Sequence, residues 1–195
     1  MTEKLIERTV DLMIEEQLVL EKKKEDYVYT LTCMLESIIT LTTIVILSFF
    51  FKNTIHTIGF LWFFFFLRKR TGGYHAETFF GCFLSTVIIY IGLVPVCRIF
   101  LQYPMLRWMM LIVTCCVIFV IGGVNHPNMN MDKEEFESAK NSARLALILE
   151  IMIIGFFKWL HTAEIFVTYL SVAVLLCGIL LCVAKMIGQE VKKDE

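Results

Sequence analysis

Charged side chains are scarce in this chain of 195 residues, because Asp, Glu, Lys and Arg make up only 19% of it. Soluble globular domains carry about 25% charged residues. The formal net charge is −1 and no stretch forms a basic domain, so the chain is not expected to bind nucleic acid. Apolar residues account for 57% of the chain, against roughly 45–50% in soluble proteins. The composition therefore indicates an integral membrane protein.

Paired cysteines and an apolar leader are also missing. None of the seven cysteines forms a Cys-x-x-Cys pair, which argues against a zinc ribbon or a dithiol redox site. Most of them stand in apolar runs, where cysteine acts as a small hydrophobe, so no disulfide is expected, and neither is a cofactor. The first residues, MTEKLIERTVDLMIEEQL, lack the apolar core of a signal peptide. The first membrane helix is therefore expected to direct insertion.

Long runs without charge mark the candidate membrane helices, since about 20 apolar residues cross a bilayer as a helix. Three runs are long enough: Thr78–Cys97, Trp108–Met131 (expected to end near Val124) and Ile165–Ala184. Three weaker segments are Val28–Phe51, Asn53–Leu67 and Ala143–Leu160. The expected fold is all-α, with about six membrane helices; four full spans with two partial ones is the alternative.

The positions of Lys and Arg set the orientation, because these residues concentrate on the cytosolic side of a membrane. If residue 1 lies in the cytosol, all but four of the 18 lysines and arginines face the cytosol. The four in outer loops are Lys52, Arg98, Arg107 and Lys158, and His56 and His161 fall in outer loops as well. Both ends of the chain are therefore expected in the cytosol.

Three regions follow from this topology: a cytosolic element over residues 1–26, a membrane domain over 27–188 and a short cytosolic tail over 189–195. The first region has apolar residues at helical spacing, with acidic residues opposite them: Ile6, Val10, Met13, Ile14 and Leu18. This pattern predicts an amphipathic helix. Such a helix either lies on the inner membrane surface or packs on the cytosolic loops, and both alternatives stay open.

A polar cytosolic loop is expected over residues 125–144 of the membrane domain. Its sequence is rich in turn-forming residues, and Pro127 is expected to stop the helix that precedes it. Asp132 is a suitable N-cap for a short helix that runs through Arg144. No internal repeat or low-complexity tract accompanies these regions.

The chemistry concentrates in a boundary segment over residues 68–85, which begins RKRTGGYHAETFFGC. His75 and Cys82 are the only histidine and cysteine that lie close together in a polar setting. A thiol becomes a nucleophile when a base or a nearby cation favours its thiolate, and histidine can also return the proton to a leaving group. Three cations precede the pair and favour the anion: Arg68, Lys69 and Arg70.

The spacing of the pair requires a bend in the backbone. On one continuous helix, seven residues separate the two Cα atoms by about 10.5 Å along the axis. Proton transfer needs heavy atoms at roughly 3 Å or one bridging water. Gly72, Gly73 and Gly81 can supply the bend, because glycine adopts backbone angles that strain other residues. Irregular backbone at this depth also needs shielding by protein or a wet cavity, which would open to the cytosol.

Plainer interpretations compete with catalysis. A His and a Cys at a helix start are often an interfacial His and a packed Cys. A zinc site needs three or four protein ligands, and no others are near in the sequence. Glu36 and Glu150 are acids inside membrane segments, where such residues often serve function. They leave open a small transporter, or an assembly protein that only holds a partner in the membrane.

The pattern Arg68-x-x-x-Gly72-Gly73-x-His75-x6-Cys82-x-x-Ser85 resembles the AgrB-like family, the accessory gene regulator protein B of Gram-positive bacteria. The similarity extends over almost the whole chain, although the cytosolic loop has fewer lysines than the family form. The resemblance implies a homodimeric cysteine endopeptidase in the bacterial cell membrane, without a cofactor. Its substrate would be an AgrD-like propeptide with an amphipathic leader, a core and an acidic tail.

The resemblance also implies residue roles. Cys82 would be the nucleophile that releases the tail and holds the core as a thioester, and His75 would be the base and acid. A Cys or Ser of the core would then close a thiolactone or lactone ring. Ser85 either donates a hydrogen bond to the site or packs against a helix. A last group of cations either binds the acidic tail or serves topology and lipid headgroups: Arg68, Arg70 and Lys133.

A reporter domain fused after Glu195 is expected to read as cytosolic, because six membrane helices return the chain to its starting side. Paired fusions to a cytosol-active and an exterior-active reporter measure this. An exterior signal would mean an odd number of spans. Asn53–Leu67 or Ala143–Leu160 would then be the first segment to suspect of not crossing.

Overall fold

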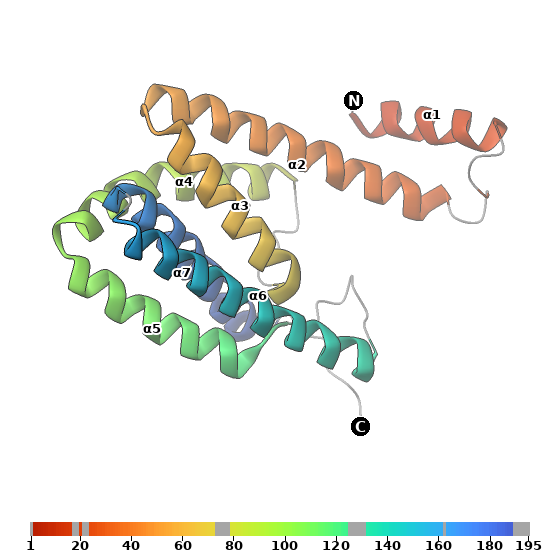
Figure 1. The fold of residues 1–195 in the computed structure, drawn as a ribbon. Coiled ribbons are helices and arrows are strands. Elements are labelled where there is room, and N and C mark those ends of the chain that lie inside the picture. Colours follow the sequence, from red (N-terminus) through yellow and green to blue (C-terminus); the bar gives the residue numbers. More distant parts are fainter. Residues whose placement is uncertain are drawn as a thin grey trace.

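A computed structural model describes residues 2–16, 20, 24–72, 79–124, 132–161 and 163–188, and every regular element within these ranges is an α-helix (Figure 1). The helices are α1 (Thr2–Glu15), α2 (Lys24–Phe50), α3 (Thr54–Thr71), α4 (Phe79–Gln102), α5 (Pro104–Ile121), α6 (Lys133–Trp159) and α7 (Glu164–Ile187). The all-α fold class is thereby confirmed.

Three of the helices are long and apolar enough to cross a membrane, judged by length and composition. They are the segment Phe80–Gln102 of α4, the whole of α5 and the whole of α7. The three strongest apolar runs in the sequence thus coincide with the three candidate spans. A shorter apolar stretch, Met34–Phe50, lies within α2. The total number of spans stays a prediction.

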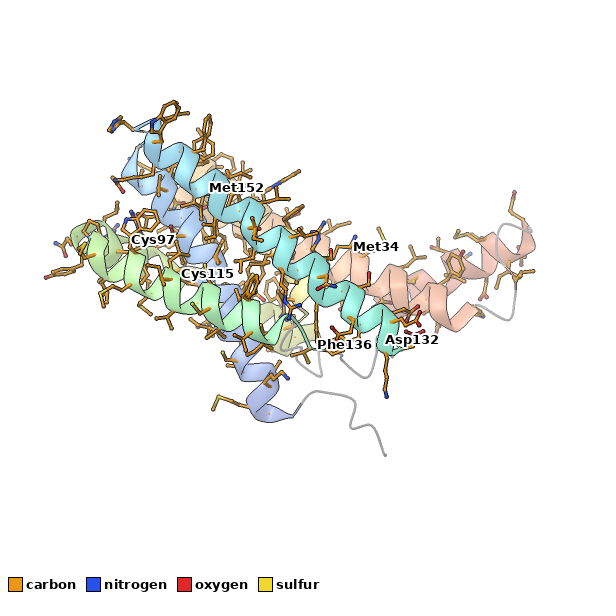
Figure 2. The ribbon with its side chains drawn as sticks, turned by 60° about the horizontal axis from the view of Figure 1, so that its bottom comes forward. Met34, Cys97, Cys115, Asp132, Phe136 and Met152 are labelled. Atoms are coloured by element: carbon orange, nitrogen blue, oxygen red, sulfur yellow. The ribbon has the colours of Figure 1, made fainter. Side chains whose placement is uncertain are left out.

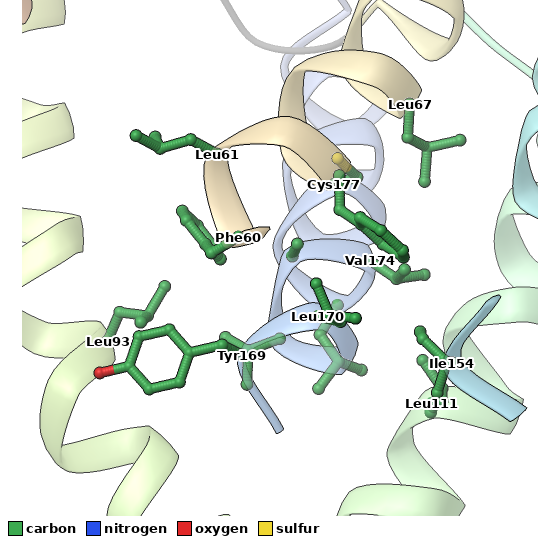
Figure 3. Close-up of a cluster of buried hydrophobic side chains, with 14 of the residues drawn as sticks. Phe60, Leu61, Leu67, Leu93, Leu111, Ile154, Tyr169, Leu170, Val174 and Cys177 are labelled. Atoms are coloured by element: carbon green, nitrogen blue, oxygen red, sulfur yellow. The ribbon is translucent and has the colours of Figure 1, made fainter. Parts of the chain in front are cut away.

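Helix α7 forms the centre of the bundle. Its sequence is apolar around its whole circumference, which is typical of a helix with neighbours on all sides. Thirteen of its 24 residues are buried, whereas only three residues of α5 are. Figure 3 shows side chains of the other helices converging on it: Phe60 and Leu67 of α3, Leu93 of α4, Leu111 of α5 and Ile154 of α6. The core is therefore built around α7, and α4 and α5 leave most of their apolar side chains outward.

A glycine allows α7 to approach α5 closely. A Cβ atom added to Gly178 would lie only 2.3 Å from Cγ2 of Thr114 on α5, well inside van der Waals contact. Small residues at helix–helix contacts commonly allow such close approach in membranes. The space at Gly155 of α6 is different, because nothing lies within 4 Å of a Cβ built there.

The boundaries of α5 and α6 correct two predictions. Helix α5 ends at Ile121, where Gly122 adopts a φ of 74° and its N–H donates to the Ile118 carbonyl, so the helix stops before Pro127. Asp132 is the N-cap of α6, as predicted, and forms a capping box with Glu135. The short helix, however, does not end at Arg144. Residues 133–154 contain no Gly or Pro, and α6 continues unbroken to Trp159.

The predicted N-terminal helix packs against α2, which in turn contacts α3 and α4 (Figure 1). Ile6 and Val10 are the buried residues of its apolar face, and the side chain of Asp11 forms an ion pair with Lys24 on α2. Whether α1 also lies on the membrane surface stays a prediction.

Four residues predicted in outer loops lie in helices instead: His56, Arg98, Arg107 and Lys158. Arg107 is fully buried within α5, where its guanidinium donates to the hydroxyl of Thr168 and pairs with Glu164 at 3.0 Å. A buried cation needs an ion-pair partner and hydrogen bonds, and Glu164 and Thr168 of α7 supply them to Arg107. His56 lies near the start of α3, with its ring 5.6 Å from that of Tyr169.

A buried polar network connects α3, α4 and α7 near the start of α3. The Asn53 amide donates to the Tyr169 hydroxyl at 2.5 Å, and Tyr90 donates to the Asn53 side-chain oxygen at 3.2 Å. The hydroxyls of Thr57 and Tyr90 lie 2.8 Å apart. Satisfied polar groups of this kind specify one arrangement of the helices that carry them. The network therefore fixes α3 and α4 relative to each other, although these helices make few other contacts in the described structure.

Gly178→Ala is expected to lower the free energy of unfolding by about 1–3 kcal/mol, because the added methyl group must separate α5 from α7. Thermal unfolding of the purified protein in detergent measures the effect. Gly155→Ala is the matched control, since its methyl group enters open space. An equal melting temperature for the two variants would contradict the close packing at Gly178.

Candidate active site

The chain breaks at the predicted position between the two helices that carry the site. Helix α3 ends at Thr71, and Gly72 follows with φ 64° and ψ −142°, which is far from helical. Helix α4 then begins at Phe79. Gly72 is therefore not helical, as predicted, whereas the bend predicted between His75 and Cys82 stays a prediction. His75 and Gly73 lie outside the described residues, so the approach of His75 to Cys82 stays a prediction.

Cys82 lies in the first turn of α4 and is exposed. Among the described cysteines it lies nearest the start of a helix, a position that depends on where α4 begins and that the residue pattern alone does not give. None of the described cysteines is in a disulfide: Cys82, Cys97, Cys115, Cys116, Cys177 and Cys182.

Arg68 is the cation that the structure brings to Cys82. Its guanidinium lies near enough to the thiols of Cys82 and Cys177 to interact with both electrostatically. The same guanidinium donates to the carbonyl oxygen of Gly72, the residue at which α3 ends. Arg68 thus places positive charge beside the thiol and holds the end of α3 at the same time.

The other two predicted cations are placed differently. Arg70 stacks over the Phe66 ring at 4.0 Å and donates to the Ser142 hydroxyl of α6 at 3.1 Å. Lys133 is exposed at the start of α6, beside Asp132. Figure 2 shows that the end of α6 that bears Asp132 and Phe136 projects from the bundle. Arg70 is therefore held between α3 and α6, and Lys133 lies on the projecting end of α6.

The hydroxyl of Ser85 hydrogen-bonds to the backbone of its own helix. Its Oγ donates to the carbonyl oxygen of Cys82 at 3.0 Å, and Thr86 donates to the same oxygen at 2.7 Å. Such bonds to the preceding turn are common for Ser and Thr in helices. In this arrangement, Ser85 supports the backbone of Cys82 rather than its thiol.

Glu150 lies buried inside the bundle, with 2% of its surface exposed. Among the residues that the structure describes, neither of its carboxyl oxygens has a hydrogen-bond partner. Three groups from three other helices are near enough to interact with it electrostatically: Arg70 of α3, Cys115 of α5 and Cys177 of α7. Its position is compatible with a functional acid, and Cys177 interacts electrostatically with Arg68 as well as with Glu150.

Three comparisons with known proteins bear on these observations. The family model described as Accessory gene regulator B matches residues 6–183, which is most of the chain and includes the whole boundary segment. No curated protein matches, and no solved structure matches. Within the described residues, no group of three or more His, Cys, Asp or Glu side chains could hold a metal ion.

Arg68→Gln is expected to slow alkylation of Cys82 at neutral pH, because it removes a cation that interacts electrostatically with that thiol. Peptide mass spectrometry after timed treatment with iodoacetamide measures the rate. Arg70→Gln is the matched control, since Arg70 is bonded to Ser142. Equal rates in the two variants would show that Arg68 does not act on the thiol.

Proposed function

Since this chain belongs to the accessory gene regulator B family, we propose that it is a membrane cysteine endopeptidase that cleaves and cyclises a propeptide through Cys82. The family takes part in processing the quorum-sensing peptide of accessory gene regulator systems, and this role applies to the chain as a member. Its partner is accordingly an AgrD-like propeptide. The cysteine mechanism and the residue roles are the proposal.

The first half of the reaction releases the tail of the propeptide. His75 takes the proton of the Cys82 thiol, and the sulfur attacks the carbonyl carbon between the core and the tail. The tetrahedral intermediate collapses as His75 returns the proton to the amine of the tail. The C–N bond breaks, the tail leaves, and the core stays bound to Cys82 as a thioester.

The second half closes the ring. A Cys thiol or Ser hydroxyl inside the core attacks the thioester carbonyl and gives its proton to His75. The C–S bond to Cys82 breaks and the thiolate regains the proton, so the enzyme returns to its starting state. The thioester keeps the acyl group reactive, and ring closure therefore needs no ATP. Exclusion of water at the membrane boundary would protect this intermediate from hydrolysis.

The arrangement of Cys82 and Arg68 is the observation that carries the proposal. An exposed thiol stands in the first turn of α4, with the Arg68 guanidinium in electrostatic reach. A nearby cation favours the thiolate that the first step requires. The end of α3 at Gly72 is compatible with the proposal, because the segment that carries His75 is then not a continuation of α3.

The acidic tail is the natural partner of the cations on the cytosolic side. Lys133 is exposed, and Arg70 has a half-buried guanidinium that stacks on Phe66. We assign tail binding to these two residues and thiolate stabilisation to Arg68. The hydrogen bond from Ser85 to the Cys82 carbonyl assigns Ser85 to support of the helix turn.

A non-enzymatic transporter is the second candidate, and Glu150 is the observation that favours it. A buried carboxyl without a partner in the described structure is costly inside a membrane protein unless it serves a function. A transporter would depend on Glu150 and would tolerate the loss of Cys82. An endopeptidase would show the opposite dependence.

Cys82→Ala and Cys82→Ser are each expected to abolish release of the tail while membrane insertion stays normal, because no other described cysteine lies in the first turn of α4. Coexpression with the propeptide and mass spectrometry of the fragments measure this. Cys116→Ala is the control, since Cys116 is also exposed but lies within α5. Tail release by Cys82→Ala at a substantial fraction of the normal rate would rule out the mechanism.

A further inference from the structure

We infer that Gly123 is a positioning residue for the active site, and this inference rests on the proposed function. Gly123 lies just beyond α5, more than 40 residues along the chain from Cys82. It allows the exit of α5 to approach the end of α3, and this contact fixes Gly72 and Arg68. We call the contact, formed by Thr71, Gly72, Gly123 and Val124, the α3–α5 junction.

The α3–α5 junction is a backbone contact in a buried setting. The Val124 N–H donates to the Thr71 carbonyl oxygen at 3.0 Å. Thr71 is 0% exposed and Val124 is 1% exposed. A hydrogen bond in such surroundings is shielded from competition with water, and its loss would leave buried groups without a partner. The contact therefore holds the two chain segments at a defined separation.

The junction leaves little room for a side chain at either glycine. A Cβ atom on Gly123 would lie 3.2 Å from the Thr71 carbonyl oxygen and 3.5 Å from that of Arg70. A Cβ atom on Gly72 would lie 2.9 Å from the Val124 carbonyl oxygen. These neighbours are backbone atoms rather than flexible side chains. A methyl group at residue 123 therefore has to move the end of α3 away from Val124.

The junction is connected to the reacting thiol through Arg68. The Gly72 N–H donates to the Arg68 carbonyl oxygen at 3.0 Å, and the Gly72 carbonyl accepts from the Arg68 guanidinium. That guanidinium is in electrostatic reach of Cys82. A displacement of Thr71 and Gly72 therefore shifts the anchor of the cation that favours the thiolate. Misplacement by about 1 Å can cost a factor of 100 in rate.

Gly123→Ala tests the inference in cleavage assays on the full chain with its propeptide. We expect kcat to fall about 10-fold and KM to rise by a smaller factor, because Arg70, to which we assign tail binding, also stands at the displaced end of α3. Alkylation of Cys82 by iodoacetamide should slow as well. A merely structural role would lower the melting temperature and the amount of folded protein without changing the reactivity of the remaining thiol.

Three glycine variants are the controls. Gly92→Ala and Gly155→Ala introduce the same methyl group where nothing lies within 4 Å, so both should keep normal kcat. Gly122→Ala strains a residue with φ 74°, and its Cβ meets the Lys140 side chain instead of α3. It should lower the melting temperature with a smaller loss of kcat than Gly123→Ala. Val124→Pro removes the N–H donor of the junction and serves as the second test variant if Gly123→Ala does not accumulate.

The outcomes separate this inference from the proposed function. If the unaltered chain releases no tail, or releases it equally well as Cys82→Ala, the proposed function fails. If the unaltered chain is active and Gly123→Ala or Val124→Pro matches Gly92→Ala in kcat and in Cys82 alkylation, the positioning role of the junction is overturned. A selective loss of kcat and of Cys82 reactivity supports it.

Discussion

The bilayer core offers no water to a backbone N–H or C=O group, and this constraint decides where the chain can be helical and where it can be chemically active. Through the core, the chain satisfies its backbone inside helices such as α5 and α7. It departs from helical geometry at Gly72 and Gly122, where the helices end. The α3–α5 junction pairs one of the freed carbonyls with a freed N–H, so the irregular backbone at this boundary is ordered.

The two ends of the bundle use polarity in different ways. Near the start of α3, the side chains of Asn53, Tyr90 and Tyr169 hydrogen-bond to one another. These bonds fix α3, α4 and α7 relative to each other. At the end of α3, Arg68 divides its interactions between the Gly72 carbonyl and the nearby thiols. The network near the start of α3 supplies a rigid frame, and the exposed thiol of Cys82 lies within electrostatic range of Arg68 at the other end of that helix.

The sequence predicts what depends on local pattern and misses what depends on neighbours. The apolar runs predicted the positions of the three candidate membrane spans, and Asp132 was correctly predicted as the N-cap of α6. Gly72 was named among the glycines at which the backbone could leave the helix, and α3 ends there. The burial of Arg107 was not predicted, because its partners Thr168 and Glu164 stand on another helix. The role of Gly123 was missed for the same reason: nothing near it in the chain indicates that it meets the backbone of Thr71. His75 and Gly73 lie outside the described residues, so their predicted roles stay untested.

The central place of α7 has a consequence for how the protein is made. In chain order, α7 follows all the helices that pack on it, and the bond from Asn53 to Tyr169 joins residues 116 positions apart. Helices α3 to α6 are therefore synthesised before their common neighbour. Long-range contacts of this kind form late and slowly. A chain that stalls on the ribosome before α7 already contains the whole cysteine segment, yet it lacks the helix that holds α3, α4 and α5 together. The site can therefore assemble only after α7 has been synthesised.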